Sequence, residues 1–142
     1  MKKFLLLCIV FALALIACQA KAQQQPKSGD PLTGTWVGDF GDGYFDRNTI
    51  TLELKWDGKK LAGTVRPGDP SGRMFRNFTP FPIEKAVYDP ATNSIKFEAM
   101  FAPRDRTYII DGKVNGDNMA GKWNRPTESR SGDFKLTRQK TK

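Results

Sequence analysis

The chain has 142 residues, a formal net charge of +8, two cysteines and no histidine. Histidine is the usual general base near neutral pH, the commonest zinc ligand and the partner of nucleophilic serine or cysteine. Its absence therefore excludes most hydrolase and metalloenzyme chemistries. We expect a single domain with no enzymatic activity, no catalytic residue, no metal and no cofactor.

Residues 1–17 have the pattern of a signal peptide. Lys2 and Lys3 precede the apolar run Phe4–Ala17, which is shorter than the ~20 residues that a helix needs to cross a bilayer. The end of this run and the next residue spell LIAC at 15–18. These letters resemble the lipobox of bacterial lipoproteins. In that family the cysteine is acylated and becomes the mature N-terminus. The resemblance implies lipidation at Cys18 and a lipid anchor in a bacterial cell envelope.

Residues 18–31 are polar, contain proline and glycine, and show no hydrophobic period, which is typical of a flexible tether. The letters AKA at 20–22 also fit the small-x-small rule for ordinary signal cleavage. Cleavage after Ala22 is therefore the alternative, and it gives a secreted or soluble periplasmic protein. In both cases the globular domain, residues 32–140, has no disulfide because both cysteines precede it.

From Leu32 onward the apolar residues recur with a period of two. Ile50, Leu52 and Leu54, for example, alternate with polar residues, as expected for a strand with one buried face. No segment carries a convincing helical stripe. The pattern predicts an all-β domain of eight antiparallel strands, at about 34–41, 48–56, 61–66, 81–88, 94–101, 107–114, 119–124 and 132–138.

Two stretches of the chain, 55–65 and 113–123, align without a gap. Each contains a hairpin turn of the Asp-Gly or Asn-Gly type, which suits a tight two-strand connection. Each also places a glycine, Gly63 or Gly121, on the expected inward face. A glycine there lets a strand bend or lets a neighbouring aromatic ring lie across it. The repeat therefore indicates a curved sheet that closes into a barrel.

In an up-and-down barrel the connections between strands alternate between the two ends. One group of connections is short and rich in Asp, Asn and Gly, and the other is longer and irregular. The short group comprises 57–60, 89–93 and 115–118, and the long group comprises 42–47, 67–80, 102–106 and 125–131. The barrel should therefore have one tightly turned end and one open end.

Arginine is concentrated in or beside the long connections, where Arg and Phe are interleaved between 73 and 78. Guanidinium groups bind anionic groups through two parallel hydrogen bonds, and aromatic rings supply apolar contact. The candidate ligand-binding residues are Arg66, Arg73, Phe75, Arg76, Phe78, Arg104, Arg106, Arg125 and Arg130. The alternative is that these arginines only pair with carboxylates of the same connections, namely Asp42, Asp46, Asp69, Asp105 and Glu128.

The letters LTGTW at 32–36 resemble the start of the calycin barrels, the group that contains lipocalins and avidin-like proteins. In that family the tryptophan of the G-x-W motif packs against a basic residue on the last strand. The resemblance implies a calycin-like, eight-stranded up-and-down barrel in which Gly34, Trp36 and Arg138 form a structural signature. It also implies a ligand bound inside the barrel. The stretch 32–138 further looks like uncharacterised secreted bacterial barrels.

The combined expectation is a monomeric, non-catalytic envelope lipoprotein that binds a small amphiphilic or anionic ligand at its Arg- and Phe-rich open end, with no nucleic-acid partner. Gly38 and Asp42 stand where avidin-like proteins carry biotin-binding Asn and Ser, so we do not expect biotin binding. The inward aromatic residues predict a filled lower half and a cavity near the open end. The alternative function is a filled barrel that serves as an envelope protein-interaction or structural module without a small ligand.

Overall fold

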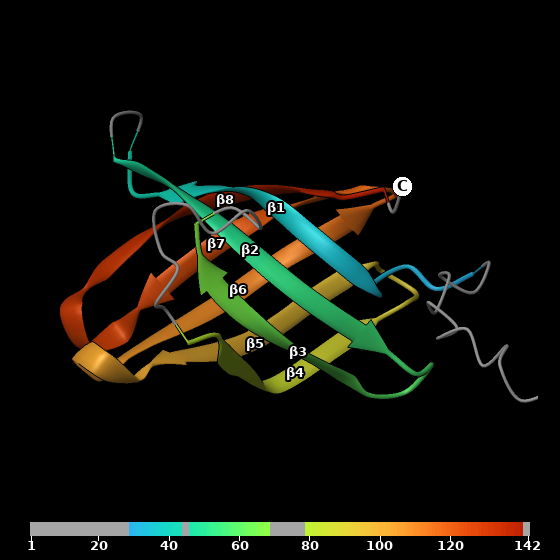
Figure 1. Ribbon diagram of the computed structural model, residues 1–142, viewed down its shortest axis with the longest axis horizontal. Coiled ribbons are helices and arrows are strands. Elements are labelled where there is room, and N and C mark those ends of the chain that lie inside the picture. Colours follow the sequence, from blue (N-terminus) through green and yellow to red (C-terminus); the bar gives the residue numbers. More distant parts are fainter. Residues whose placement is uncertain (1–28, 44–45, 69–78, 141–142) are drawn as a thin grey trace, which may run out of the picture.

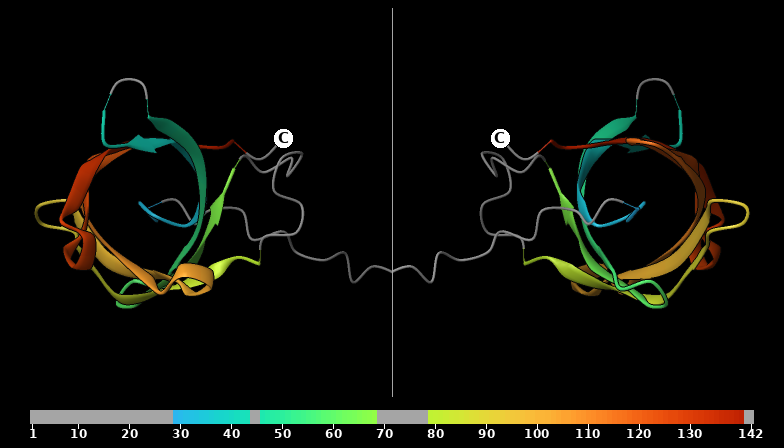
Figure 2. Two further views of the ribbon diagram at one scale, coloured as in Figure 1. Left: turned by 90° about the vertical axis from the view of Figure 1, so that its left-hand side faces the viewer. Right: turned by 90° about the vertical axis from the view of Figure 1, so that its right-hand side faces the viewer.

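The computed structural model describes residues 29–43, 46–68 and 79–140. Its strands form a closed barrel in sequence order, and the last strand pairs with the first (Figures 1 and 2). The predicted antiparallel eight-stranded barrel is confirmed, and every predicted strand boundary lies within two residues of the observed one. The strands are β1 (Gly34–Gly41), β2 (Arg47–Trp56), β3 (Leu61–Pro67), β4 (Phe81–Asp89), β5 (Ser94–Phe101), β6 (Arg106–Asn115), β7 (Asn118–Arg125) and β8 (Arg130–Arg138).

Two short helical turns that the hydrophobic pattern does not predict complete the described elements. The turn η1 (Ala102–Arg104) connects β5 to β6, and η2 (Pro126–Glu128) connects β7 to β8. No helix in the described part of the chain is long and apolar enough to cross a membrane. The predicted signal peptide and Cys18 lie outside the described residues, as does most of the predicted tether.

Alternation along the strands separates a buried inner face from an exposed outer face. Nearly all inner residues are apolar, and their burial is the main stabilising contribution for a domain without a disulfide. The buried apolar core consists of Leu32, Trp36, Leu52, Leu54, Leu61, Val65, Ile83, Tyr88, Ile95, Phe97, Ala99, Val114, Met119, Phe134 and Leu136.

The strand order places the connections at two ends of the barrel, as predicted. We call the end with the β1–β2 connection, η1 and η2 the open end, and the end with the turns at 57–60, 90–93 and 116–117 the tight-turn end. Figure 1 shows η1 and η2 together at the left, and the N-terminal segment at the right. The described chain therefore enters the barrel at the tight-turn end.

The tight-turn end is closed by the segment just before β1. Figure 2 shows this segment lying across the end of the barrel, and its Leu32 side chain is fully buried. Two hydrogen bonds to the Asp30 carboxylate fix the segment, from the backbone N–H groups of Leu32 (2.9 Å) and Thr33 (2.8 Å). Burial alone would raise the pKa of Asp30. The hydrogen bonds from Thr33 and Leu32 and the charge of Arg138 outweigh burial and lower the pKa below its ordinary value of 3.8.

The contact implied by the G-x-W resemblance is present at this end. The guanidinium carbon of Arg138 lies 4.6 Å from the centre of the Trp36 ring, and the two residues are paired across β1 and β8. A cation over an indole face is favourable by roughly 0.5–2 kcal/mol. Arg138 also donates hydrogen bonds to the carbonyl oxygens of Asp30, Pro31 and Thr33. The signature residue of the last strand thus ties the N-terminal segment to the barrel wall.

The seam between β3 and β4 is the shortest in the barrel. Only Thr64↔Pro82 and Val65↔Phe81 are paired across it. Proline has no N–H to donate to the ladder, and β4 is bulged between Glu84 and Val87. Lys85 has a φ of 47° in the bulge. A regular alternating strand was predicted here, and the bulge is the main local departure from that prediction.

Candidate functional site

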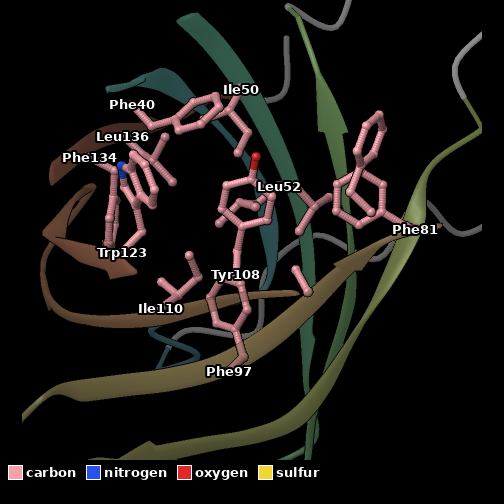
Figure 3. Close-up of a pocket in the computed structure, with 13 residues that line it drawn as sticks. Phe40, Ile50, Leu52, Phe81, Phe97, Tyr108, Ile110, Trp123, Phe134 and Leu136 are labelled. Carbon is pink, nitrogen blue, oxygen red and sulfur yellow. The ribbon is translucent and has the colours of Figure 1, made fainter. Parts of the chain in front are cut away.

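A cavity of about 70 Å³ lies in the half of the barrel nearer the open end (Figure 3). The other half is filled by core residues such as Trp36, Ile95 and Met119. The only polar side-chain atoms among the cavity-lining residues are the Tyr108 hydroxyl and the Trp123 indole N–H. The cavity is lined by Phe40, Ile50, Leu52, Val65, Phe81, Phe97, Ala99, Phe101, Tyr108, Ile110, Trp123, Phe134 and Leu136.

Three aromatic rings form one side of this cavity. Phe40, Tyr108 and Trp123 come from β1, β6 and β7, and their ring centres lie 5.6–6.3 Å apart with steep interplanar angles. Figure 3 shows the Phe40, Tyr108 and Trp123 rings grouped around the cavity. The Phe40 ring meets the other two rings edge to face, whereas Tyr108 and Trp123 are tilted by 54°, and contacts of these kinds hold rings in preferred orientations. This side of the cavity is therefore preformed.

Arg125 lies next to these rings, at the open-end terminus of β7. It is two residues after the inward-facing Trp123, so it points to the same side of the strand, and it is only 3% exposed. Its guanidinium carbon lies 5.3 Å from the Tyr108 ring centre and 5.8 Å from that of Trp123. A buried charged side chain is uncommon and requires compensating partners.

The compensation of Arg125 is incomplete. Its Nη2 lies 3.2 Å from a Glu128 oxygen, and its Nη1 is 3.5 Å from the Tyr108 hydroxyl. Its Nε is buried and has no hydrogen-bond partner among the described residues, and the same is true of Trp123 Nε1. Leaving a buried donor unpaired costs about 1–3 kcal/mol. Two such donors therefore lie on a pair of side chains in mutual contact, beside the cavity.

Glu128 is shared between two arginines. Arg106, at the start of β6, places its Nε 2.7 Å from one Glu128 oxygen, while Arg125 contacts the other oxygen. One carboxylate thus faces two guanidinium groups. This cluster of Arg106, Arg125 and Glu128 carries one net positive charge, and its Arg125 lies against the cavity-lining Tyr108 and Trp123.

Other predicted arginines are placed differently. Arg130 pairs with Asp42 and with Asp46, as the charge-pairing alternative expected, and the Arg130 guanidinium lowers the pKa of the Asp42 carboxyl. Arg104 is exposed in η1 and has no ion-pair partner among residues 29–43, 46–68 and 79–140. Arg66 follows the cavity-lining Val65, so alternation puts it on the outer face of β3.

The remaining predicted ligand-binding residues, Arg73, Phe75, Arg76 and Phe78, lie outside the described residues. The cavity-lining Phe40 and Tyr108 are absent from the predicted set. The signal for Tyr108 was available in the sequence, because it has the same parity as the inward Ile110 of β6. No group of three or more Asp, Glu, Cys or His residues that could hold a metal ion occurs within the described ranges.

No protein-family model matches the chain, and no curated protein matches it. Among solved structures, a redesigned β-barrel is similar to it, with a TM-score of 0.57 and 10% sequence identity, over 77% of this chain and 92% of that chain. At this level of identity the likeness shows the fold alone. The antiparallel eight-stranded barrel is thus supported by a neighbour, and a relationship to the calycin family rests on the sequence resemblance.

Proposed function

We propose that the protein is a non-catalytic binding protein that takes a small amphiphilic or anionic molecule into its open-end cavity. The observation that carries this proposal is the incompletely paired, buried Arg125 beside an apolar, aromatic-lined cavity. Binding sites for small molecules combine a mainly apolar concave surface with a few convergent polar groups. The lipocalin-like mode of binding suggested by the G-x-W resemblance is consistent with this arrangement.

The energetics favour a binding role over simple imperfect packing. An unfilled cavity of 70 Å³ costs about 2 kcal/mol at ~24 cal/mol per Å³. The unpaired Arg125 and Trp123 donors add about 1–3 kcal/mol each. Domains are stable by only about 5–15 kcal/mol. A ligand that fills the cavity and accepts from both donors would recover this cost.

The alternative, a protein-interaction or structural module, has less support on the described surface. Val87 and Met100 are the large hydrophobic residues that are exposed there, at 62% and 43%. The β4–β5 register pairs Val87 with Lys96, which is four residues from Met100 along β5. They therefore form no contiguous apolar patch of the kind that marks a docking surface.

We expect a small neutral amphiphile, 1-hexanol, to bind saturably to the mature protein. Trp123 lines the cavity whereas Trp36 and Trp56 do not, so binding should change the tryptophan emission of the native protein. It should also raise the unfolding temperature, because a ligand at 100 times its Kd stabilises by about 2.7 kcal/mol.

Ala99→Val is the variant that tests the cavity itself. Ala99 lines the cavity and is 2% exposed, and two added methyl groups would fill part of the empty volume in a strand that favours β-branched residues. The variant should remain folded and lose 1-hexanol binding. Met100→Val, on the outer face of the same strand, is the matched control and should bind normally. Saturable binding that survives Ala99→Val, or no binding to the native protein, would contradict the proposal.

We also propose that the protein is held in a bacterial cell envelope by lipidation of Cys18, on the basis of the LIAC motif. The described chain enters at the tight-turn end, so the anchor would direct the open end away from the membrane. The N-terminal peptide of the mature protein should begin at a diacylated or triacylated Cys18. Mass spectrometry that finds an unmodified Cys18, or a peptide starting at Gln23, would refute the anchor.

A further inference from the structure

We infer that the ligand is a short-chain monocarboxylate whose carboxylate binds Arg125 and the indole N–H of Trp123 at the open-end edge of the cavity. This inference rests on the proposed binding function and adds to it the charge, the head group and the size of the ligand. Three properties of the described residues support it, namely the unpaired donors, the local charge and the cavity volume.

The unpaired donors define what the head group must do. Arg125 Nε and Trp123 Nε1 are both buried and unpartnered, and their side chains touch, with the guanidinium carbon 5.8 Å from the indole ring centre. Buried polar groups in proteins are almost always hydrogen-bonded. Both groups are donors only. The missing partner is therefore an acceptor, and a carboxylate that reached these two side chains would supply it.

The charge of the cluster sets the charge of the ligand. Arg106, Arg125 and Glu128 together carry one net positive charge. Their side chains are 29%, 3% and 30% exposed, so interactions at Arg125 are less screened by solvent than those at the rim. One added negative charge neutralises the cluster. A phosphate, with a charge of about −1.5 to −2 near pH 7, would leave a surplus beside Glu128.

The cavity volume limits the apolar part. At 70 Å³, it is about half the ~150 Å³ of an engineered cavity that binds benzene. A short aliphatic chain fits this volume, whereas a long acyl chain does not. We therefore expect the apolar part of the ligand to place about three to five carbon atoms inside the cavity, with its carboxylate at Arg125.

Calorimetric titration of the mature protein with hexanoate and with 1-hexanol tests the inference. The two molecules have the same chain length and differ in charge. Hydrogen bonds to a charged group contribute about 1.5–3 kcal/mol, so hexanoate should bind about 10- to 100-fold more tightly than 1-hexanol. Arg125→Met keeps an apolar side chain of similar length and should abolish this preference, while 1-hexanol binding changes less than about threefold.

Arg104→Met is the matched control for charge. Arg104 is exposed at the same end and has no ion-pair partner among the described residues, so its replacement removes the same unit charge from a different place. The preference for hexanoate should persist in this variant. Trp123→Phe keeps a ring and removes the Nε1 donor, and it should reduce the preference for hexanoate over 1-hexanol several-fold. It also keeps the test valid if Arg125→Met is poorly folded.

The possible outcomes separate the inference from the proposed function. Failure of both ligands to bind would overturn both. Equal binding of hexanoate and 1-hexanol, or an equal loss of preference in Arg104→Met and Arg125→Met, would overturn the carboxylate site and leave the cavity function standing. In a series of butanoate, hexanoate, decanoate and hexadecanoate, affinity should stop rising near hexanoate. A steady rise to hexadecanoate would overturn the short-chain assignment.

Discussion

Replacing Trp36 by alanine should lower the free energy of unfolding by about 3–5 kcal/mol. Trp36 is 0% exposed and is the largest of the fully buried side chains. Its indole N–H donates to the Leu32 carbonyl at 2.8 Å, and Arg138 covers its ring. The substitution therefore leaves a large cavity, an unpaired carbonyl and a guanidinium group without its aromatic partner, all at the end of the barrel that the chain enters.

Chemical denaturation followed by circular dichroism measures this loss, and two further variants show its origin. Trp36→Phe keeps an aromatic ring under Arg138 but loses the bond to Leu32, so it should cost less, about 1–2 kcal/mol. Trp56→Ala should also cost less than Trp36→Ala, because Trp56 is only partly buried where it meets Tyr88. A loss below about 1.5 kcal/mol for Trp36→Ala would show that the N-terminal segment does not depend on this residue.

The fold could be predicted from the sequence because the residue pattern of most strands shows which side chains face the inside of the barrel. Alternation of apolar and polar residues defines the inner face, and Asn-Gly or Asp-Gly turns define hairpins. The Trp36–Arg138 contact was implied by the resemblance to the calycin barrels and is present in the structure. The bulge at Lys85 was missed although the period breaks there: Lys85 has the parity of the inward Phe81 and Ile83 but is exposed, and the buried positions shift to Ala86 and Tyr88.

The candidate site was predicted less well, because arginines were grouped by the end of the barrel and not by the face of the strand. The same parity rule that placed Trp123 inward also places Arg125 inward, and it places Arg66 outward beside Val65. Applied to every candidate arginine on a strand, it would have removed Arg66 and kept Arg125 together with Arg106 and Arg130, which share the parity of the inward Tyr108 and Phe134. The sharing of Glu128 between two arginines, by contrast, depends on the geometry of η2, for which the sequence holds no periodic signal.

The second large effect is expected at the pair of inward glycines that face each other across β6 and β7. Gly112 and Gly121 are register partners. A Cβ built on Gly121 would lie 2.2 Å from the Asp111 carbonyl oxygen and 2.4 Å from the Gly112 Cα. Both are backbone atoms, which cannot rotate away as a side chain can. Gly121→Ala should therefore force the two strands apart and lower the free energy of unfolding by about 3 kcal/mol.

Gly43→Ala is the control for this variant, because a Cβ at Gly43 would meet no atom within 4 Å and the residue has no positive φ. It should change stability by less than about 0.5 kcal/mol. Chemical denaturation measures both variants. A similarly small change in the free energy of unfolding for Gly121→Ala would contradict the expected clash between β6 and β7.

The glycine pair also connects stability to the cavity. A Cβ on Gly112 would lie 2.7 Å from Cζ of Phe134, and Phe134 is one of the rings that line the cavity. The bare backbone at Gly112 thus lets this ring lie against the wall, a role that was predicted for Gly63 and Gly121 but not for Gly112. Gly112→Ala should push the ring toward the cavity, because the wall can no longer accept it. We therefore expect Gly112→Ala to weaken 1-hexanol binding even in conditions where the variant is fully folded, while Gly43→Ala binds normally.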